Sequence, residues 1–376
     1  MLCPHAKKCS GCQLQNMEYC DQLSFKQAKL IKLLGMYGHV DKIIGMEDPL
    51  HYRNKVQAAF SFRRGRIVSG VYQSATGAVV PVDECLLEDV GADRIIVTVR
   101  RLCADFNIKA FDSRTGKGFL RHVMVRKSEK SGKYMVVLVT ARGNFRSKRK
   151  FAEELLRRHP EIETLLHSIN NTDKGLMLGN SCEILHGDGY ITDSLCGLDF
   201  RISPTAFFQV NHSQTERLYG IAAELAALTG NETLLDAYCG TGTVGLILAK
   251  SAGRVIGVEI NRDSVEDAKH NARINGIENA RFYAADAGRF MDELAESGER
   301  IDVVVTDPPR AGCSPAFLKS LISLAPERVV YISCNPTTLS RDLYTLKKGG
   351  YKIKKIRPVD LFPYTEHIET VVLLTR

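Results

Sequence analysis

Five side chains that could do chemistry recur at regular intervals through the second half of the sequence. They are Asp236, Glu259, Asp286, Asp307 and Cys334, separated by 23, 27, 21 and 27 residues. Each stands at the end of a short apolar run, and a helical pattern follows each run, so one interval is about one strand plus one helix. We therefore predict an α/β fold with a doubly wound parallel sheet, whose strand ends bring four carboxylates and a thiol to one crevice.

The glycine-rich stretch "LLDAYCGTGTVG" (234–245) follows the first of these strands and contains a G-x-G-x-x-G pattern that starts at Gly240. This pattern also occurs in enzymes that bind nicotinamide dinucleotides, where an acidic residue on the next strand holds a ribose. Here Asp236 precedes the glycines, where a carboxylate can help to hold an ammonium group. Glu259 can bind ribose hydroxyls, and Asp286 is positioned to meet an adenine. Together these residues favour S-adenosylmethionine (SAM) over a nicotinamide cofactor.

The stretch "TDPPR" (306–310) and Cys334 indicate which kind of atom is methylated. Enzymes that methylate exocyclic amines place an aromatic residue after Asp-Pro-Pro to stack on the base, whereas Arg310 follows here. Carbon 5 of a pyrimidine is a poor nucleophile, but addition of a thiolate to C6 makes C5 reactive. We therefore predict that Cys334 is a nucleophile for carbon methylation rather than a structural cysteine.

The last strand, "IETVVLLTR", begins near Glu369. The connection that precedes it, "LFPYTEH", is too short for a helical crossover, so we expect this strand to be antiparallel. The start of an antiparallel strand lies at the same sheet edge as the ends of its parallel neighbours. Glu369 is therefore expected at the edge that carries Cys334.

An ordered set of motifs from about residue 203 to the end resembles the RNA 5-methyluridine methyltransferases. These motifs are "SPTAFFQVN", "DAYCGTGTVG", "DPPRAG", "YISCNPTTLSRD" and "DLFPYTEHIETVVLL". The resemblance implies a Rossmann-like class I SAM-dependent methyltransferase domain, with Cys334 as nucleophile and Glu369 as the base that removes the C5 proton. The SAM contacts that it implies are Gln209, Tyr238, Thr243, Glu259 and Asp307. Some members have Asn where this sequence has Thr243.

Four cysteines, Cys3, Cys9, Cys12 and Cys85, form a C-x5-C-x2-C pattern followed by a distant fourth thiol. Four thiolates can bind zinc or an iron–sulfur cluster, and the spacing alone does not choose, since His5 keeps a mixed zinc site possible. The ribosomal-RNA branch of the resembled family carries a [4Fe-4S] cluster on this arrangement. The resemblance therefore implies the cluster, and it also implies a short form without a preceding RNA-binding barrel.

Charge is concentrated in one part of the 376-residue chain. Residues 51–150 contain 21 Lys and Arg against 8 Asp and Glu, whereas the whole chain has a net charge of +8. Such a surplus is best explained by a polyanionic partner, most simply nucleic acid. No signal peptide or apolar run of membrane-spanning length is visible. We therefore expect a cytoplasmic, monomeric protein whose partner is RNA, with neither membrane nor DNA as a partner.

These features predict three segments: a cysteine-rich iron–sulfur segment (1–40, with Cys85), a β-rich basic RNA-binding region (41–203) and a SAM-dependent methyltransferase domain (204–376). Within them we expect a helix near 23–35, two strands around a basic turn at 63–66, a hairpin around 131–132 and a helix near 148–159.

The function expected from the residues and the resemblance is SAM-dependent methylation of uracil C5 in 23S rRNA, of the uracil-747 type, through a covalent Cys–C6 adduct that yields 5-methyluridine. The same chemistry on another 23S rRNA uridine or on tRNA is the nearest alternative. An RNA cytosine-C5 methyltransferase usually has a second cysteine where Arg310 stands. A non-catalytic RNA-binding protein and an NAD-dependent oxidoreductase are further alternatives.

Overall fold

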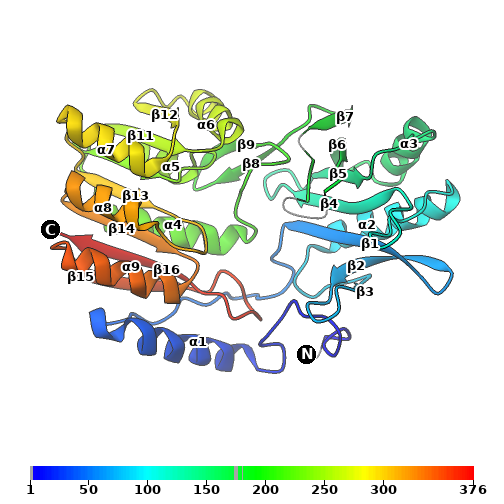
Figure 1. Ribbon diagram of the computed structural model, residues 1–376, viewed down its shortest axis with the longest axis horizontal. Helices are drawn as coiled ribbons and strands as arrows, with labels where there is room; N and C mark the ends of the chain where they lie inside the picture. The colour runs from blue at the N-terminus through cyan, green and yellow to red at the C-terminus, as the bar shows by residue number, and fades with distance from the viewer. Residues whose placement is uncertain (1–2, 173–176, 180) are drawn as a thin grey trace. The chain divides into compact units, whose positions relative to one another are not determined.

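The computed structural model describes residues 3–172, 177–179 and 181–376, and its contacts divide the chain into two compact units (Figure 1). Unit 1 consists of Met1–Asn16, Asp48–Asp193 and Ile202–Thr205. Unit 2 consists of Met17–Glu47, Ser194–Arg201 and Ala206–Arg376. This division differs from the three expected segments, because residues 17–47 pack with the C-terminal part of the chain.

Unit 2 is built on a seven-stranded sheet with the strand order β12-β11-β10-β13-β14-β16-β15. The first five strands in this order are parallel to one another, and β16 runs antiparallel to both β14 and β15. The doubly wound sheet and its antiparallel last strand are therefore confirmed. The strands are β10 (Thr233–Ala237), β11 (Arg254–Glu259), β12 (Ala280–Ala284), β13 (Val303–Thr306), β14 (Arg328–Ser333), β15 (Lys352–Val359) and β16 (Glu369–Thr375).

Helices alternate with the parallel strands of unit 2, as the sequence pattern requires. They are α4 (His212–Ala226), α5 (Thr243–Ala249), α6 (Arg262–Ile274), α7 (Ala287–Ser297), α8 (Pro315–Leu324) and α9 (Pro336–Lys348). The connection from β14 to α9 has residues that end the strand and begin the helix at defined positions. Asn335 accepts a hydrogen bond from the Thr337 backbone N–H as the helix cap, and Pro336 occupies the first helical turn, where its missing N–H is not needed.

Helix α1 (Tyr19–Leu34) confirms the helix expected near 23–35, but it belongs to unit 2 and not to the cysteine-rich segment. Leu30 and Leu34 are fully buried in the core of unit 2. On the same helix, Lys26 Nζ lies 2.6 Å from Asp360 Oδ1, and neither side chain is exposed. A short 3-10 helix, η1 (Gly35–Tyr37), follows, and the Tyr37 hydroxyl donates to the Ser340 carbonyl of α9.

Unit 1 contains a second seven-stranded sheet, with the order β3-β2-β1-β4-β5-β6-β7. Its strands are β1 (Lys55–Arg63), β2 (Arg66–Tyr72), β3 (Val79–Pro81), β4 (Leu120–Lys127), β5 (Tyr134–Thr140), β6 (Ile162–Ile169) and β7 (Cys182–His186). Helices α2 (Val90–Asp105) and α3 (Lys148–Arg158) share one buried core with this sheet. The strands flanking the basic turn, the hairpin and the helix at α3 are as expected.

Two strands, β8 (Ile191–Leu195) and β9 (Leu198–Ile202), form a separate small sheet. Among the helices in the described part of the chain, none is long and apolar enough to cross a membrane.

The buried Lys26–Asp360 pair gives a stability prediction. Lys26→Met leaves the Asp360 carboxylate buried without its cation, so we expect it to lower the free energy of unfolding by about 3–5 kcal/mol. Lys29→Met is the matched control, because Lys29 lies one turn along α1 and reaches Glu366 at 3.5 Å with both side chains partly exposed. It should lower the stability by less than about 1 kcal/mol. Urea unfolding measures both, and equal losses would show that the buried pair does not hold α1 in place.

Candidate active site

Cys334 and Glu369 come together because β14 and β16 are paired. Ser333 is opposite Thr370 in this antiparallel pair. One step further towards the sheet edge, Cys334 follows the end of β14 and Glu369 begins β16. Glu369 is buried, Cys334 is half-buried, and the carboxylate contributes to the electrostatics of the thiol. The structure thus brings the two predicted catalytic residues together.

Burial controls the protonation of this pair. It raises the pKa of the Cys334 thiol to about 12, and the negative charges of Glu369 and Asp307 reinforce the shift. Burial and Asp307 also raise the pKa of Glu369 well above its usual range. The Arg310 guanidinium opposes both shifts. At neutral pH the free protein therefore holds both groups mainly in their neutral forms, and Arg310 is the side chain that favours their ionisation.

Arg310 is held in place from two sides. Its backbone carbonyl accepts hydrogen bonds from Asn335 Nδ2 at 3.1 Å and Thr338 Oγ1 at 3.3 Å. Its Nη2 lies 3.1 Å from His367 Nδ1. Because burial and the Arg310 charge lower the pKa of His367, its neutral ring can accept this hydrogen bond at neutral pH. Sequence reasoning missed His367, which no spacing rule connects to Arg310.

The glycine-rich loop follows β10 and has an unusual backbone conformation that brings the start of α5 close to β10. Tyr238 has a φ of 65°, in the left-handed region that is unusual for a non-glycine residue, and its ring lies 5.1 Å from that of Phe317. Such backbone strain is typical of functional sites. A side chain at Gly245 would lie 2.9 Å from Asp236 Oδ2, so the start of α5 can approach the strand only with glycine there.

Two of the predicted cofactor carboxylates also hold this loop. Asp236 Oδ2 accepts a hydrogen bond from the Gly245 N–H at 2.7 Å, and burial raises its pKa to about 7. Glu259 accepts from the Gly240 N–H at 3.2 Å and from the Asn261 N–H at 2.9 Å. Both carboxylates therefore fix the conformation of the loop by accepting hydrogen bonds from its backbone, in addition to any contact with a ligand.

The remaining predicted cofactor residues lie along the same edge of unit 2. Asp286 caps α7 by accepting from the Arg289 N–H at 3.0 Å. Asp307 follows β13 directly, and burial raises its pKa to about 7. Thr243 begins α5, with its hydroxyl 3.2 Å from that of Thr241.

Tyr219 is a site residue that sequence reasoning missed. It lies on α4, is 4% exposed and hydrogen-bonds the side chain of Gln209, one of the predicted SAM contacts. Burial, followed by the charges of Asp307 and Glu369, raises its pKa well above the usual range. A buried tyrosine on an amphipathic helix resembles an ordinary core residue, so its sequence position carried no signal.

The cysteines of unit 1 are only partly brought together. The charges of Cys9 and Cys3 act on Cys12, whose pKa burial raises to about 12, and Cys9 Sγ accepts from the Gly11 N–H at 3.4 Å. Burial also raises the pKa of Cys85 to about 12. Among the residues that the structure describes, no group of three or more His, Cys, Asp or Glu is arranged to hold a metal ion. As placed, the four cysteines do not form a ready-made cluster site.

Comparison with known proteins identifies the family of this chain. A family described as tRNA (Uracil-5-)-methyltransferase matches residues 183–376. An uncharacterized RNA methyltransferase of Halalkalibacterium halodurans is 41% identical over 99% of this chain and 82% of its own length. Another, from Clostridium acetobutylicum, is 42% identical over 100% of this chain and 83% of its own length.

A solved structure is similar over nearly the whole chain. The tRNA (uracil-54, C5)-methyltransferase of Pyrococcus abyssi, in complex with S-adenosyl-L-homocysteine, has a TM-score of 0.82 and 30% identity. The alignment covers 97% of this chain and 86% of the Pyrococcus chain. The family model, the relatives and the fold agree, and the chain belongs to the tRNA (Uracil-5-)-methyltransferase family of SAM-dependent RNA-methylating enzymes.

Proposed function

We propose that the protein methylates C5 of a uracil in 23S rRNA, of the uracil-747 type, through a covalent bond between Cys334 and C6 of the base. The observation that carries the chemistry is the register of β14 and β16, which sets a thiol beside a buried carboxylate. The ribosomal target is supported by the N-terminal cysteines, an arrangement of the ribosomal-RNA branch. A tRNA target is the second candidate, because the similar Pyrococcus enzyme acts on tRNA.

The carboxyl edge of the sheet suits SAM, which supplies a transferable methyl group and a positive charge. Asp236 and Asp307, whose pKa burial raises to about 7, are partly ionised at neutral pH, and a bound cation would favour their ionised forms. Glu259 keeps lone pairs for ribose hydroxyls beside its bonds to the loop. The residues proposed to hold SAM are Gln209, Asp236, Tyr238, Gly240, Thr243, Glu259, Asp286 and Asp307.

The reaction divides between the two catalytic residues. The Cys334 thiol gives its proton to solvent, and the thiolate adds to C6. The C5–C6 electron pair shifts so that C5 becomes nucleophilic, and C5 takes the methyl group of SAM, which leaves S-adenosylhomocysteine. Glu369 then removes the proton from C5, the C5–C6 double bond re-forms and the S–C6 bond breaks to release the thiolate. Glu369 must be ionised to act as this base, and the positive charges of Arg310 and of bound SAM would favour its ionised form. Burial gives this carboxylate a high proton affinity, which suits a base that takes a proton from carbon.

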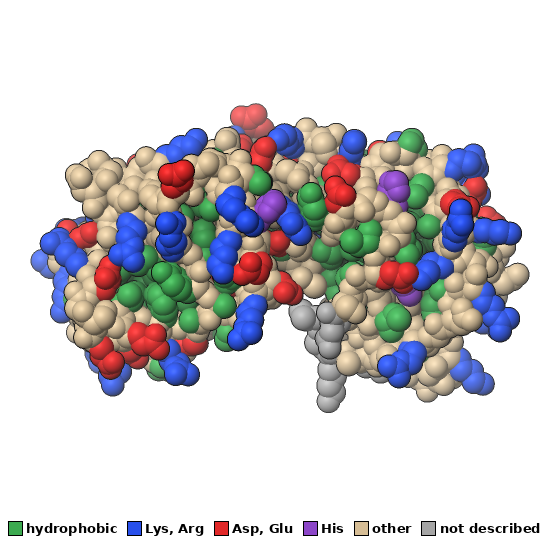
Figure 2. Space-filling view, turned by 90° about the horizontal axis from the view of Figure 1, so that it is seen from above, with side chains coloured by type: hydrophobic (Ala, Val, Ile, Leu, Met, Phe, Trp, Pro, Cys, Tyr) green, Lys and Arg blue, Asp and Glu red, His purple; other side chains and the backbone are tan. Residues whose placement is uncertain are grey.

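RNA reaches such a site only if the target base leaves its stack, and the basic surplus of residues 51–150 would help to retain it. On the face that Figure 2 shows, Lys and Arg side chains are spread among acidic ones and do not form a single patch.

Variants of the two catalytic residues should fail differently. Cys334→Ala should form neither product nor covalent complex. Glu369→Gln should still add and transfer the methyl group, then stall with RNA attached through Cys334, because the amide cannot accept the proton. Denaturing gels with labelled 23S rRNA fragments and labelled tRNA would show a slow-migrating band for the true substrate.

The double variant Cys334→Ala/Glu369→Gln is the control for this band and should not form it. A band with tRNA alone would replace the ribosomal target by tRNA. Turnover of Glu369→Gln at the rate of the unchanged protein would mean that another residue is the base.

Arg310 should control the reactivity of Cys334. Arg310→Gln removes the cation that opposes the raised pKa of Cys334, so that pKa should rise further and less thiolate should exist at any pH. Between pH 7 and 10, alkylation of Cys334 by iodoacetamide, followed by mass spectrometry of its peptide, should be about tenfold slower. Arg300→Gln is the control, since Arg300 is exposed and pairs with Asp302 and Glu327. Equal rates in all three proteins would exclude this role for Arg310.

We further propose that Cys3, Cys9, Cys12 and Cys85 hold a [4Fe-4S] cluster. The support is their number, their soft thiolate chemistry and the mutual influence of the first three, which lie within one short segment. Cys85 and Cys12 also share Glu88 as a neighbouring charge. Cluster binding would require these thiols to move closer together and to lose their protons.

Iron content tests this assignment. Protein purified without oxygen should be brown and contain about four irons per chain. Cys12→Ser should lose most of the iron, whereas Cys20→Ser, which changes an exposed cysteine outside the set, should keep it. Elemental analysis that finds one zinc and no iron, or no metal at all, would contradict the cluster.

A further inference from the structure

The loop between β13 and α8, residues 307–313, carries two of the groups that act on Cys334. Burial raises the pKa of this thiol, the charge of Asp307 reinforces the shift, and the charge of Arg310 opposes it. The loop contains neither strand nor helix, so no regular pattern of backbone hydrogen bonds fixes it. Its conformation, and with it the place of Arg310, must therefore depend on side chains that bind its backbone.

One face of α9 supplies these side chains. The carbonyl of Arg310 accepts a hydrogen bond from Thr338 Oγ1 at 3.3 Å. Three residues further along the same helix, Arg341 Nη2 donates to the carbonyls of Ala311 at 2.9 Å and of Cys313 at 3.1 Å. Residues three apart in a helix lie on one face, so a single face of α9 holds three carbonyls of the loop.

The Arg341 guanidinium is itself held by a buried carboxylate. Its Nε donates to Asp342 Oδ1 at 2.8 Å, and the Asp342 side chain is fully buried. Asp342 Oδ2 also accepts from the Cys313 N–H at 2.8 Å and from the Tyr331 hydroxyl at 2.7 Å. Tyr331 belongs to β14, the strand that leads to Cys334. The carboxylate therefore ties the loop to both α9 and β14.

Gly312 lets the loop come this close to the pair. Its φ of 76° lies in the left-handed region that favours glycine. A side chain at this position would lie 2.6 Å from Arg341 Nη2 and 2.6 Å from Asp342 Oδ2. The backbone of the loop is thus fitted against these two side chains and has no room to approach them in another way.

The helix that holds the loop begins two residues after Cys334, so it can set the loop relative to the thiol. We propose that Arg341 and Asp342 are positioning residues, which hold the loop against α9 so that Arg310 keeps its charge within reach of Cys334. This inference rests on the proposed function only in taking Cys334 as the nucleophile.

The test is alkylation of Cys334 by iodoacetamide in the free protein between pH 7 and 10, followed by mass spectrometry of its peptide. Arg341→Gln should slow alkylation about 3- to 10-fold and move its pH profile to higher pH, because a pKa one unit higher leaves about ten times less thiolate. The Arg341 side chain is 56% exposed, so this change opens no cavity in the core. Unfolding cannot imitate the result, since an unfolded chain exposes the thiol at its ordinary pKa and reacts faster.

Two further variants separate the position of the loop from the charge of Arg341. Arg341→Lys keeps the charge but lacks the planar fork that joins two carbonyls to a carboxylate. Gly312→Ala changes no charge and forces the loop away from the pair. Both variants should also slow alkylation, and an unchanged rate in either of them would overturn the positioning role.

A double variant tests whether Arg341 acts through Arg310. Addition of Arg341→Gln to Arg310→Gln should cause no further slowing, because the charge that Arg341 places is already absent. A further slowing as large as that of Arg341→Gln alone would show an independent effect and contradict the proposal. Lys348→Gln is the matched control, since Lys348 is an exposed cation of α9 whose Nζ lies 4.6 Å from the centre of the Tyr344 ring. It should react as the unchanged protein does.

This inference and the proposed function can fail separately, because alkylation needs neither RNA nor SAM. Slower alkylation of the Arg341 variants in a protein that forms no covalent band with RNA would keep the positioning role and remove the proposed function. A covalent RNA band in a protein whose Arg341 variants are alkylated at the unchanged rate would do the reverse.

Discussion

The pairing of β16 with β14 is the constraint on which the proposed catalytic site depends. Because side chains alternate along a strand, a slip of one residue would turn the Glu369 side chain to the other face of the sheet. The register is fixed by residues of β16 that are fully buried between β14 and β15, among them Val371, Val372 and Leu374. The proposed catalytic pair, Cys334 and Glu369, thus lies at the end of a rigid pair of strands, which holds a site more precisely than a loop does.

Helix α1 fixes the segment that feeds into this ladder. Lys26 donates to the Phe362 carbonyl as well as to Asp360, and Gln22 Oε1 accepts from the Tyr364 N–H at 2.8 Å. These contacts hold the chain between β15 and β16, and His367 in the same segment meets Arg310. Residues of α1 therefore hold the segment that carries His367 and leads into Glu369, although they lie far from it in sequence.

Much of unit 2 could be predicted from sequence, because the carboxyl ends of parallel strands lie at one edge of the sheet, where ligands bind. Asp307 and Cys334 each follow a buried strand, and all strand ends of one direction share an edge. Glu369 was accessible by the same rule once its strand was recognised as antiparallel. The partner of α1 was not predictable, since an amphipathic pattern shows that a face is buried without showing against what. Lysine is almost never fully buried without a partner, so the burial of Lys26 beside Asp360 follows from the fold and not from the helix pattern.

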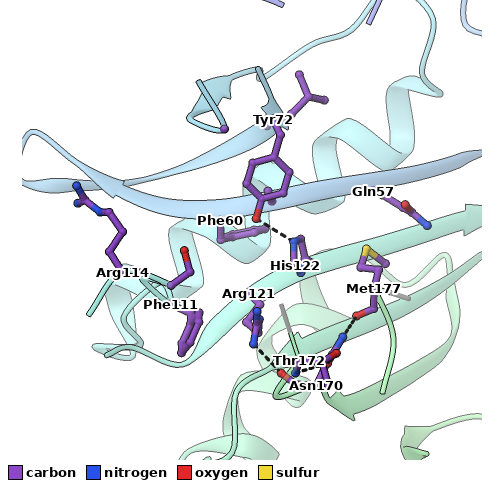
Figure 3. Close-up of a pocket in the computed structure, with 15 residues that line it drawn as sticks. Gln57, Phe60, Tyr72, Phe111, Arg114, Arg121, His122, Asn170, Thr172 and Met177 are labelled. Atoms are coloured by element: carbon purple, nitrogen blue, oxygen red, sulfur yellow. Dashed lines mark hydrogen bonds between the residues drawn. The ribbon is translucent and has the colours of Figure 1, made fainter. Parts of the chain in front are cut away.

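A cavity of about 770 Å³ in unit 1 (Figure 3), whose lining includes Ala59, Gly70 and His122, shows the limit of such reasoning most clearly. Nothing in the local sequence distinguishes Ala59, Gly70 or His122, and their strands were expected from the start. The hollow exists only because the register of two strand pairs places them next to one another. A site at the end of parallel strands follows from topology, which a sequence pattern reveals. A site on the face of a sheet follows from register, which depends on turns and on packing against distant elements.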